Sequence, residues 1–186
     1  RGVAGMVYAF KAAGAAAERM MSLEEVAGVA QKALDNIRTM GVALSPCIVP
    51  QVGEPTFQIE DDEIEIGMGI HGEKGIEVRK MMTADEVAET LVGRITEDMP
   101  LAEGDEVSVL VNGLGATPME EQLIVYRRVH ELLNDMGVKV VMPHVGEYAT
   151  SMEMAGLSVT IFKLDEQLKE LLLSPAKTPF YTNLNK

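Results

Sequence analysis

Aromatic residues and cysteine are scarce in this sequence. Aromatics make up 4% of the 186 residues and tryptophan is absent, so a hydrophobic core has to be built from aliphatic side chains, Met and Ala. Cys47 is the single cysteine, which excludes an internal disulfide and favours a reducing, cytoplasmic location. Hydrophobic residues still reach 47%, which indicates one globular domain, with room at most for a fragment of a second.

Positive charge is also in short supply. The 16 Lys and Arg residues stand against 29 Asp and Glu residues, for a formal net charge of -13. Such a chain repels phosphate backbones and anionic lipid, and no basic stripe offsets the repulsion, so we expect neither nucleic acid nor a membrane surface as a partner. Lys11 interrupts the apolar stretch 2–17, which argues against a signal peptide and a membrane helix.

Several kinds of catalytic motif are missing. The 3 histidines and the lone cysteine do not show the spacing of metal ligands, and the sequence contains neither a P-loop nor a nucleophile elbow. We therefore expect no cofactor and no metal on this chain. The sequence begins with Arg1 rather than Met, which we interpret as an interior cut.

Two helices are predicted before any strand. Residues 3–20 are rich in Ala and lack the alternation of a strand. Ser22 and Glu25 have the spacing of a capping box, and the apolar stripe behind them predicts a helix that Gly41 ends.

Three further helices are predicted downstream. Thr83 and Glu86 form a second capping box. Thr117 is the expected N-cap of a helix over 118–136, because proline occupies its first position. A short last helix is expected over 165–173, followed by a loose tail over 181–186.

Short apolar runs predict the strands. They arrive first in succession and later alternate with helices, which is typical of an α/β (α+β) domain of two layers, a mixed six-stranded sheet covered by helices. The runs are residues 47–49, 56–59, 63–68, 107–111, 138–142 and 158–164.

His71 is the strongest candidate for chemistry. It stands between glycines directly after a predicted strand, where a side chain projects from a sheet edge and the backbone can approach a ligand. A neutral imidazole is a nucleophile near physiological pH, and Glu73 is placed to fix its tautomer. The plainer interpretation is a loop histidine bonded to a neighbour. His144 has a weaker version of the same context, and His130 is expected on a helix surface.

A glycine-rich turn between a strand and a helix offers a second possibility. Backbone amides at the start of the helix after residues 111–117 are suited to binding an anion such as phosphate. Gly113 and Gly115 are equally consistent with a tight turn that binds nothing.

Several stretches together resemble the substrate-binding subunit of dihydroxyacetone kinases, in that family's order and over nearly the whole chain. They are RGVAG (1–5), GAAA (14–17), MGVALSPC (40–47), GMGIHGE (67–73), VNGLGATP (111–118) and GEYATSMEMAG (146–156). The resemblance implies that His71 adds to the ketone of dihydroxyacetone as a hemiaminal, with Gly72 beside the substrate. It also implies that residues 1–40 bridge to an absent N-terminal half, which carries the acid and base residues, and that residues 41–186 form the C-terminal α/β domain.

The same resemblance implies the partners. ADP or ATP with Mg²⁺ is expected on a nucleotide-binding partner subunit, and we expect a homodimer. A relative without catalytic activity, which senses dihydroxyacetone as coactivator of a transcription regulator, is the main alternative. A third possibility is a structural domain without ligand, in which His71 is packed inside.

Overall fold

The computed structural model describes residues 3–69, 73 and 75–184 of the chain, and within them five helices and a six-stranded sheet. The helices are α1 (Met6–Glu18), α2 (Leu23–Asp35), α3 (Ala84–Asp98), α4 (Met119–Asp135) and α5 (Glu166–Leu173). The strands of the sheet are β1 (Ile37–Ala43), β2 (Glu63–Ile66), β3 (Glu77–Lys80), β4 (Glu106–Gly113), β5 (Lys139–Gly146) and β6 (Gly156–Leu164).

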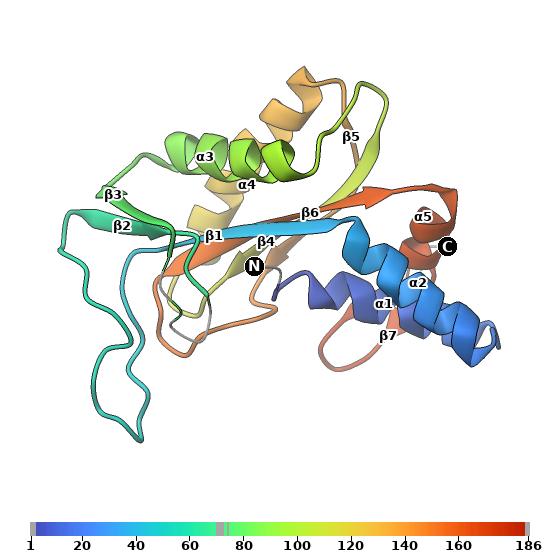
Figure 1. Cartoon of the computed structure of the whole chain (residues 1–186), viewed down its shortest axis with the longest axis horizontal. Helices are drawn as coiled ribbons and strands as arrows, with labels where there is room; N and C mark the ends of the chain where they lie inside the picture. Colours follow the sequence, from blue (N-terminus) through green and yellow to red (C-terminus); the bar gives the residue numbers. More distant parts are fainter. Residues whose placement is uncertain (1–2, 70–72, 74, 185–186) are drawn as a thin grey trace.

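The sheet has the order β3-β2-β1-β6-β4-β5. Only β4 and β5 run parallel; the other neighbours are antiparallel, so the expected mixed sheet is confirmed. Helices α3 and α4 cover one face, and α1, α2 and α5 gather at one end of the opposite face (Figure 1). Two large apolar cores result, one on each face of the sheet, and a third, smaller cluster is formed by Ala43, Cys47, Met68, Leu114 and Met154.

The centre of the sheet depends on β1 and β6, which pair along all 7 residues of β1, from Ile37 opposite Phe162 to Ala43 opposite Gly156. Gly156 has a φ of +149°, and a Cβ there would lie 2.3 Å from the carbonyl oxygen of Val42. A glycine is therefore required for the two strands to approach at this end.

Strand β1 corrects the prediction that the second helix reaches Gly41. Helix α2 ends at Asp35, and the amide of its C-cap residue Asn36 donates to the last helical carbonyls. The following residues, although inside the expected helical segment 1–40, pair with β6. Because the neighbouring strand satisfies their backbone groups and buries Ile37, sheet pairing overrides the local apolar spacing.

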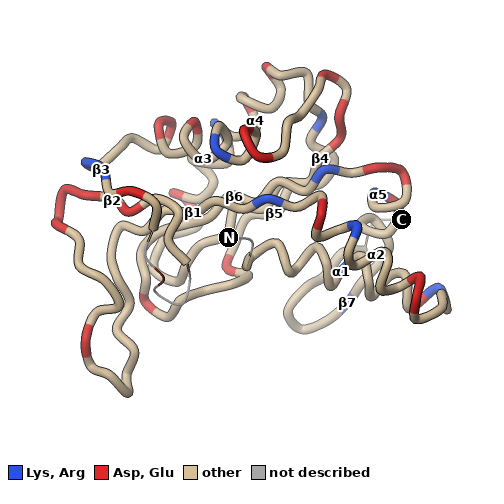
Figure 2. Tube along the Cα trace, in the orientation of Figure 1, with Lys and Arg blue, Asp and Glu red and all other residues tan. Residues whose placement is uncertain are grey.

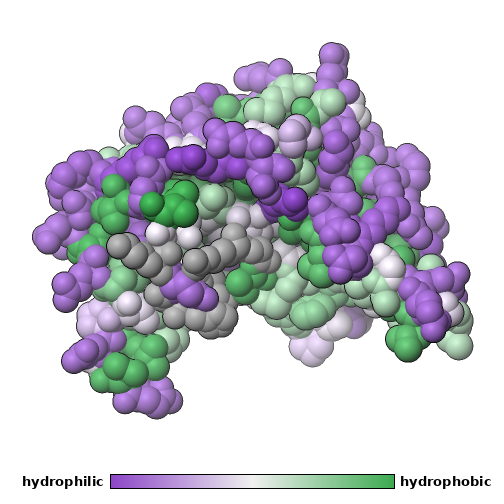
Figure 3. All heavy atoms as spheres, in the orientation of Figure 1, coloured by the Kyte–Doolittle hydropathy of each residue, from purple (hydrophilic) through white to green (hydrophobic). Residues whose placement is uncertain are grey.

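The segment between β1 and β2, residues 44–62, forms a long arm (lower left in Figure 1). The strands expected over 47–49 and 56–59 are wrong, because Ile48 and Pro55 meet only in an isolated bridge. Prolines in the arm lack the amide that a strand ladder needs. Hydrophobic atoms lie at the surface of this part of the molecule (Figure 3), and the exposed fraction of Ile48 is 46%.

Two further elements depart from prediction. Strand β3 was expected to be loop, yet it pairs with β2 over all its residues. The described part of the tail, residues 181–184, is not loose, because β7 (Ala176–Lys177) pairs with β8 (Thr182–Asn183) and the buried Asn183 side-chain amide donates to the Leu172 carbonyl at 3.3 Å.

The two capping boxes, at Ser22 and Thr83, are confirmed. The prediction of Thr117 as a cap is wrong: Pro118 caps α4 without a side-chain bond. The Thr117 hydroxyl donates to the Gly156 carbonyl and accepts from the Gly156 amide, both at 2.8 Å. The threonine therefore ties the start of α4 to β6.

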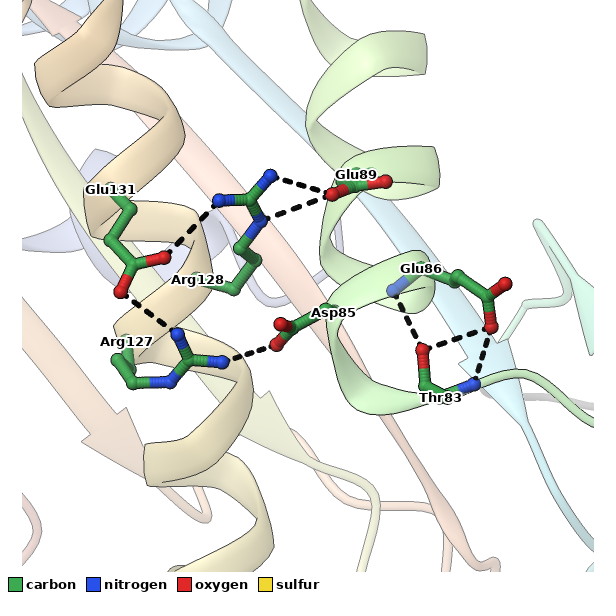
Figure 4. A network of polar contacts seen from close by, with 7 residues as sticks. All are labelled: Thr83, Asp85, Glu86, Glu89, Arg127, Arg128 and Glu131. Carbon is green, nitrogen blue, oxygen red and sulfur yellow. Dashed lines mark hydrogen bonds and ion pairs between the residues drawn. The ribbon is translucent and has the colours of Figure 1, made fainter.

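Charged residues on the surface join α3 to α4 (Figure 4). Arg127 contacts Asp85 and bonds Glu131 at 2.8 Å, while Arg128 bonds Glu89 at 2.6 Å and Glu131 at 3.2 Å. These pairs are exposed to solvent, so each contributes at most about 1 kcal/mol. Figure 2 shows acidic residues spread over many elements of the fold, which agrees with the negative net charge. Within the described ranges no helix has both the length and the apolar character needed to cross a membrane.

Replacing Thr83 by Ala should lower the free energy of unfolding by about 1 kcal/mol, because the first turn of α3 loses the hydroxyl that accepts the Glu86 amide. Urea denaturation measures the change. Thr150→Ala, at an exposed position outside the helices, is the control and should leave stability within about 0.5 kcal/mol. Equal effects of the two substitutions would contradict the assignment of the cap.

Candidate functional site

The face of the sheet opposite α3 and α4 carries buried polar side chains. Alternate residues of a strand point to opposite faces, so Val159 faces the main core while its neighbours Ser158 and Thr160 face the other way. The Thr160 hydroxyl lies 2.8 Å from that of Thr39 on β1. Hydroxyl groups from β1 and β6 thus lie next to each other on this face of the sheet.

Asn112, at the end of β4, organises the chain next to these hydroxyls. Its side-chain oxygen accepts from the amides of Tyr148 and Ala149, each at 2.8 Å, and its Nδ2 donates to the Ala149 carbonyl at 2.8 Å. A fully buried Asn with three such bonds fixes the segment after β5 against the sheet.

A small cavity of about 20 Å³ opens on this polar face. Thr39 and Ser158 contribute hydroxyl groups to its lining, and Gly69 lies at its edge. The rest of the lining is Val3, Ala4, Gly41, Met68 and Leu114. Segments from the start of the chain, from β1, β4 and β6 and from the end of β2 therefore meet at one point.

The segment after β2 is held at its beginning. The Gly67 amide donates to the Gly41 carbonyl at 2.7 Å, and Gly67 has a φ of +76°, which favours glycine. The Gly69 amide donates to the Glu73 carbonyl at 3.0 Å.

The same segment is held where it returns to β3. The Gly75 amide donates to Oε1 of Glu65 at 2.6 Å, and the Ile76 amide donates to the Ile66 carbonyl at 2.8 Å. Glu65 is buried, with 4% of its surface exposed. Sequence reasoning missed this carboxylate, because acidic residues that alternate with Ile, as in β2, ordinarily face solvent.

His71 and Gly72, the predicted site residues, lie outside the described residues. Both therefore stay predictions, as does the role of Glu73 in fixing the imidazole tautomer. The described neighbours, Gly69 and Gly75, place the two ends of the segment on the polar face of the sheet.

His144, the weaker candidate, is a partly buried member of an aromatic cluster. The Tyr8 hydroxyl lies 3.2 Å from its Nδ1, and the Tyr181 hydroxyl lies 3.1 Å from its Nε2. Burial lowers the pKa of His144 to about 4 and raises that of Tyr181 to about 12. Because the Ser108 hydroxyl in turn bonds that of Tyr8 at 2.8 Å, the neutral ring joins α1, β4, β5 and the C-terminal hairpin.

His130 is exposed on α4, as expected, and its ring centroid lies 6.0 Å from that of Tyr126. It shares no described contact with the cavity or with the segment after β2.

The glycine-rich turn before α4 serves close packing. A Cβ at Gly113 would lie 1.9 Å from Oε1 of Glu147, and one at Gly115 would lie 1.8 Å from the Met152 carbonyl oxygen. Nε2 of Gln122 donates to that same Glu147 oxygen at 2.7 Å. The turn is thus filled, and by a carboxylate, which favours the tight-turn interpretation over an anion site.

Comparison with known proteins places these features in a family context. The Dak1 domain model matches residues 1–180. The chain is 51% identical over 179 residues to the dihydroxyacetone-binding subunit DhaK of PTS-dependent dihydroxyacetone kinase 1 from Listeria innocua. The match covers 96% of this chain and 54% of that protein, so the chain spans about half the length of this relative.

Two solved structures of related proteins superpose closely on this chain. The dihydroxyacetone kinase from C. freundii, in complex with AMP-PNP and Mg²⁺, superposes with a TM-score of 0.86 at 30% identity, over 98% of this chain and 34% of that one. The dihydroxyacetone kinase operon co-activator DhaQ superposes with a TM-score of 0.86 at 33% identity, over 94% of this chain and 55% of that one.

The free energy of unfolding should decrease as the pH is lowered, because His144 is buried in its neutral form. Its pKa of about 4 in the folded state lies below the ordinary 6.5. Between pH 6.5 and pH 4 the unfolded chain therefore binds a proton at this ring, whereas the folded chain does not. The stabilisation is complete above 6.5 and is lost as pH falls toward 4. By the linkage of pKa to stability, the loss attributable to this ring between about pH 7.5 and pH 4.5 is roughly 2–3 kcal/mol.

Denaturant unfolding at the two pH values measures this loss. His144→Gln should show a pH dependence smaller by that amount, while His130→Gln, on the exposed face of α4, should keep that of the parent. Parallel curves for the parent and His144→Gln would contradict the assignment of a neutral buried imidazole.

Proposed function

Because the chain belongs to the Dak1 domain family, we propose that it is the C-terminal part of a dihydroxyacetone-binding kinase subunit in which His71 holds the substrate covalently. The observation that carries the proposal is the match of the Dak1 domain model over residues 1–180 together with 51% identity to a dihydroxyacetone-binding subunit. The cavity of about 20 Å³ beside Gly69 has room for about one water molecule, so the substrate would lie next to this polar face and not within the cavity. A triose offers two hydroxyl groups and a carbonyl, and Thr39 and Ser158 supply hydroxyl groups of matching chemistry.

The reaction with His71 is a simple addition. One ring nitrogen of the neutral imidazole attacks the carbonyl carbon, the carbonyl π electrons move to oxygen, and that oxygen gains a proton in place of the one the ring gives up. No atom is lost, and the product is a hemiaminal. Glycerol has no carbonyl carbon to attack, so the same step selects ketones over the corresponding alcohol.

The covalent bond serves positioning. A three-carbon substrate buries little surface and binds weakly, whereas a tethered one presents its hydroxyl group at a fixed place for phosphoryl transfer. Gly72, beside the histidine, leaves room for the substrate to approach the backbone. Glu73 orients the ring through its carboxylate.

The remaining machinery lies on other parts of the assembly. Residues 1–40 bridge to an N-terminal half that carries the acid and base groups, and residues 41–186 are the C-terminal domain. ADP or ATP with Mg²⁺ binds to a partner subunit, the substrate-binding subunit forms a homodimer, and the setting is the cytoplasm. The described residues hold no group of three His, Cys, Asp or Glu side chains that converge as metal ligands.

A second candidate is a non-catalytic sensor of dihydroxyacetone that acts on a transcription regulator. The superposition on the co-activator is compatible with this candidate, since the fold of this half is shared by both kinds of protein. The two candidates differ in the acid and base residues upstream of Arg1. A kinase requires them and a sensor does not.

Replacing His71 by Ala or Asn should weaken retention of dihydroxyacetone by at least about ten-fold, equivalent to about 1.4 kcal/mol, because the covalent bond is lost. Equilibrium binding to the complete gene product measures the effect, with His130→Ala as the control. Unchanged affinity in both His71 variants would contradict the covalent role.

The 186-residue chain alone should transfer no phosphate to dihydroxyacetone, even with a phosphoryl donor and its nucleotide-binding partner present, because the acid and base groups are supplied from upstream. A coupled assay for dihydroxyacetone phosphate provides the measurement. Turnover by this purified chain would show that the essential groups are already on it.

A further inference from the structure

Glu65 occupies an unusual place in β2. Its neighbours Ile64 and Ile66 face the core beneath α3 and α4, so the carboxylate points to the opposite, polar face of the sheet. Only 4% of the residue is exposed. A buried carboxylate is costly unless hydrogen bonds compensate it, and no salt bridge reaches Glu65 within the described ranges.

The bond that compensates this carboxylate comes from the segment that contains His71. Oε1 of Glu65 accepts from the Gly75 amide at 2.6 Å, a short, charge-assisted bond. The β2–β3 ladder begins two residues later, at Glu77 opposite Ile66, and the Ile76 amide before it donates to the Ile66 carbonyl. Gly75 therefore lies just outside the sheet, and the Glu65 side chain takes the place of a strand partner for its amide.

The backbone of Gly75 lies in close contact with Glu65 and with the carbonyl group of Ile66. A Cβ at position 75 would lie 2.5 Å from the Ile66 carbonyl oxygen and 2.7 Å from Cγ of Glu65. Backbone and side chain both block it, so only glycine lets the chain come close enough for the bond. The contact depends on one residue type from each side.

We propose that Glu65 is a positioning residue for the reaction of His71, acting through the Gly75 amide. The inference rests on the proposed function. On one side of His71 the Gly67 amide donates to the Gly41 carbonyl of β1, and on the other side the Gly75 amide donates to the Glu65 carboxylate of β2. Adduct formation requires the ring nitrogen to approach the carbonyl carbon in one geometry, and a displacement of about 1 Å is enough to cost a large factor.

Three substitutions separate positioning from general stability. Glu65→Ala removes the acceptor, Glu65→Gln keeps an amide oxygen that can accept the Gly75 N–H, and Glu63→Ala is the matched control on the same strand. Glu63 accepts from the Glu60 amide at 3.3 Å and pairs with Lys80 at 3.5 Å, away from Gly75.

The readout is the ¹³C NMR spectrum of dihydroxyacetone labelled at its carbonyl carbon, bound to the complete gene product. It reports the ratio of tetrahedral, histidine-bound carbon to free ketone on folded protein, well below the unfolding midpoint of each variant. Glu65→Ala should lower this ratio by about ten-fold, Glu65→Gln should stay within about three-fold of the parent, and Glu63→Ala should match the parent. Gly75→Ala should reproduce the loss from the other side of the contact.

The outcomes separate the positioning role of Glu65 from the proposed function itself. A parental ratio in Glu65→Ala, whatever its thermal stability, overturns the positioning role and leaves the proposed function intact. An equal loss in Glu65→Ala and Glu63→Ala also overturns it, because the effect is then one of strand β2 in general. A parent protein that shows no tetrahedral carbon, or a His71→Ala variant that still shows it, contradicts the proposed function, and the inference with it.

Discussion

The site depends on the alternation of side chains across β1, β6 and β4. Valines and isoleucines at every second position turn one face of the sheet toward α3 and α4, and this same register turns Thr39, Ser158 and Asn112 to the opposite face. A slip of one residue in the β1–β6 pairing would exchange the two faces. The antiparallel register and the glycine contact at Gly156 therefore determine where polar groups gather, and so where a small polar ligand can be recognised.

The segment after β2 is hydrogen-bonded to strands β1 and β2 on either side of His71. Its start is bonded to β1 through Gly67, and its end is bonded to β2 through the carboxylate of Glu65. Under the proposed function, these two bonds on either side of His71 would limit how its imidazole approaches a ketone. The fold of this half alone does not divide kinase from sensor, because both kinds of solved relative superpose on it. Fold and function are separate conclusions here.

Structure that depends on residues close in sequence was predicted better than structure that depends on contacts between distant segments. The capping boxes at Ser22 and Thr83 need only residues three positions apart, and both form. Strand β1 was missed because Ile37 continues the apolar spacing of α2, and only its distant partner β6 reveals it as a strand. Glu65 was missed for a related reason: alternation shows which residues share a face, but not whether solvent reaches that face. His71 stays a prediction: its place between glycines after a strand made it a candidate, and its covalent role rests on the family resemblance alone.

A crystal structure of the complete gene product soaked with dihydroxyacetone tests the central claim most directly. The account predicts continuous electron density between the imidazole of His71 and the central carbon of the triose, on the face of the sheet that carries Thr39 and Ser158. Density joined to a different side chain, or a position 71 ring sealed beneath the opposite face, would contradict it.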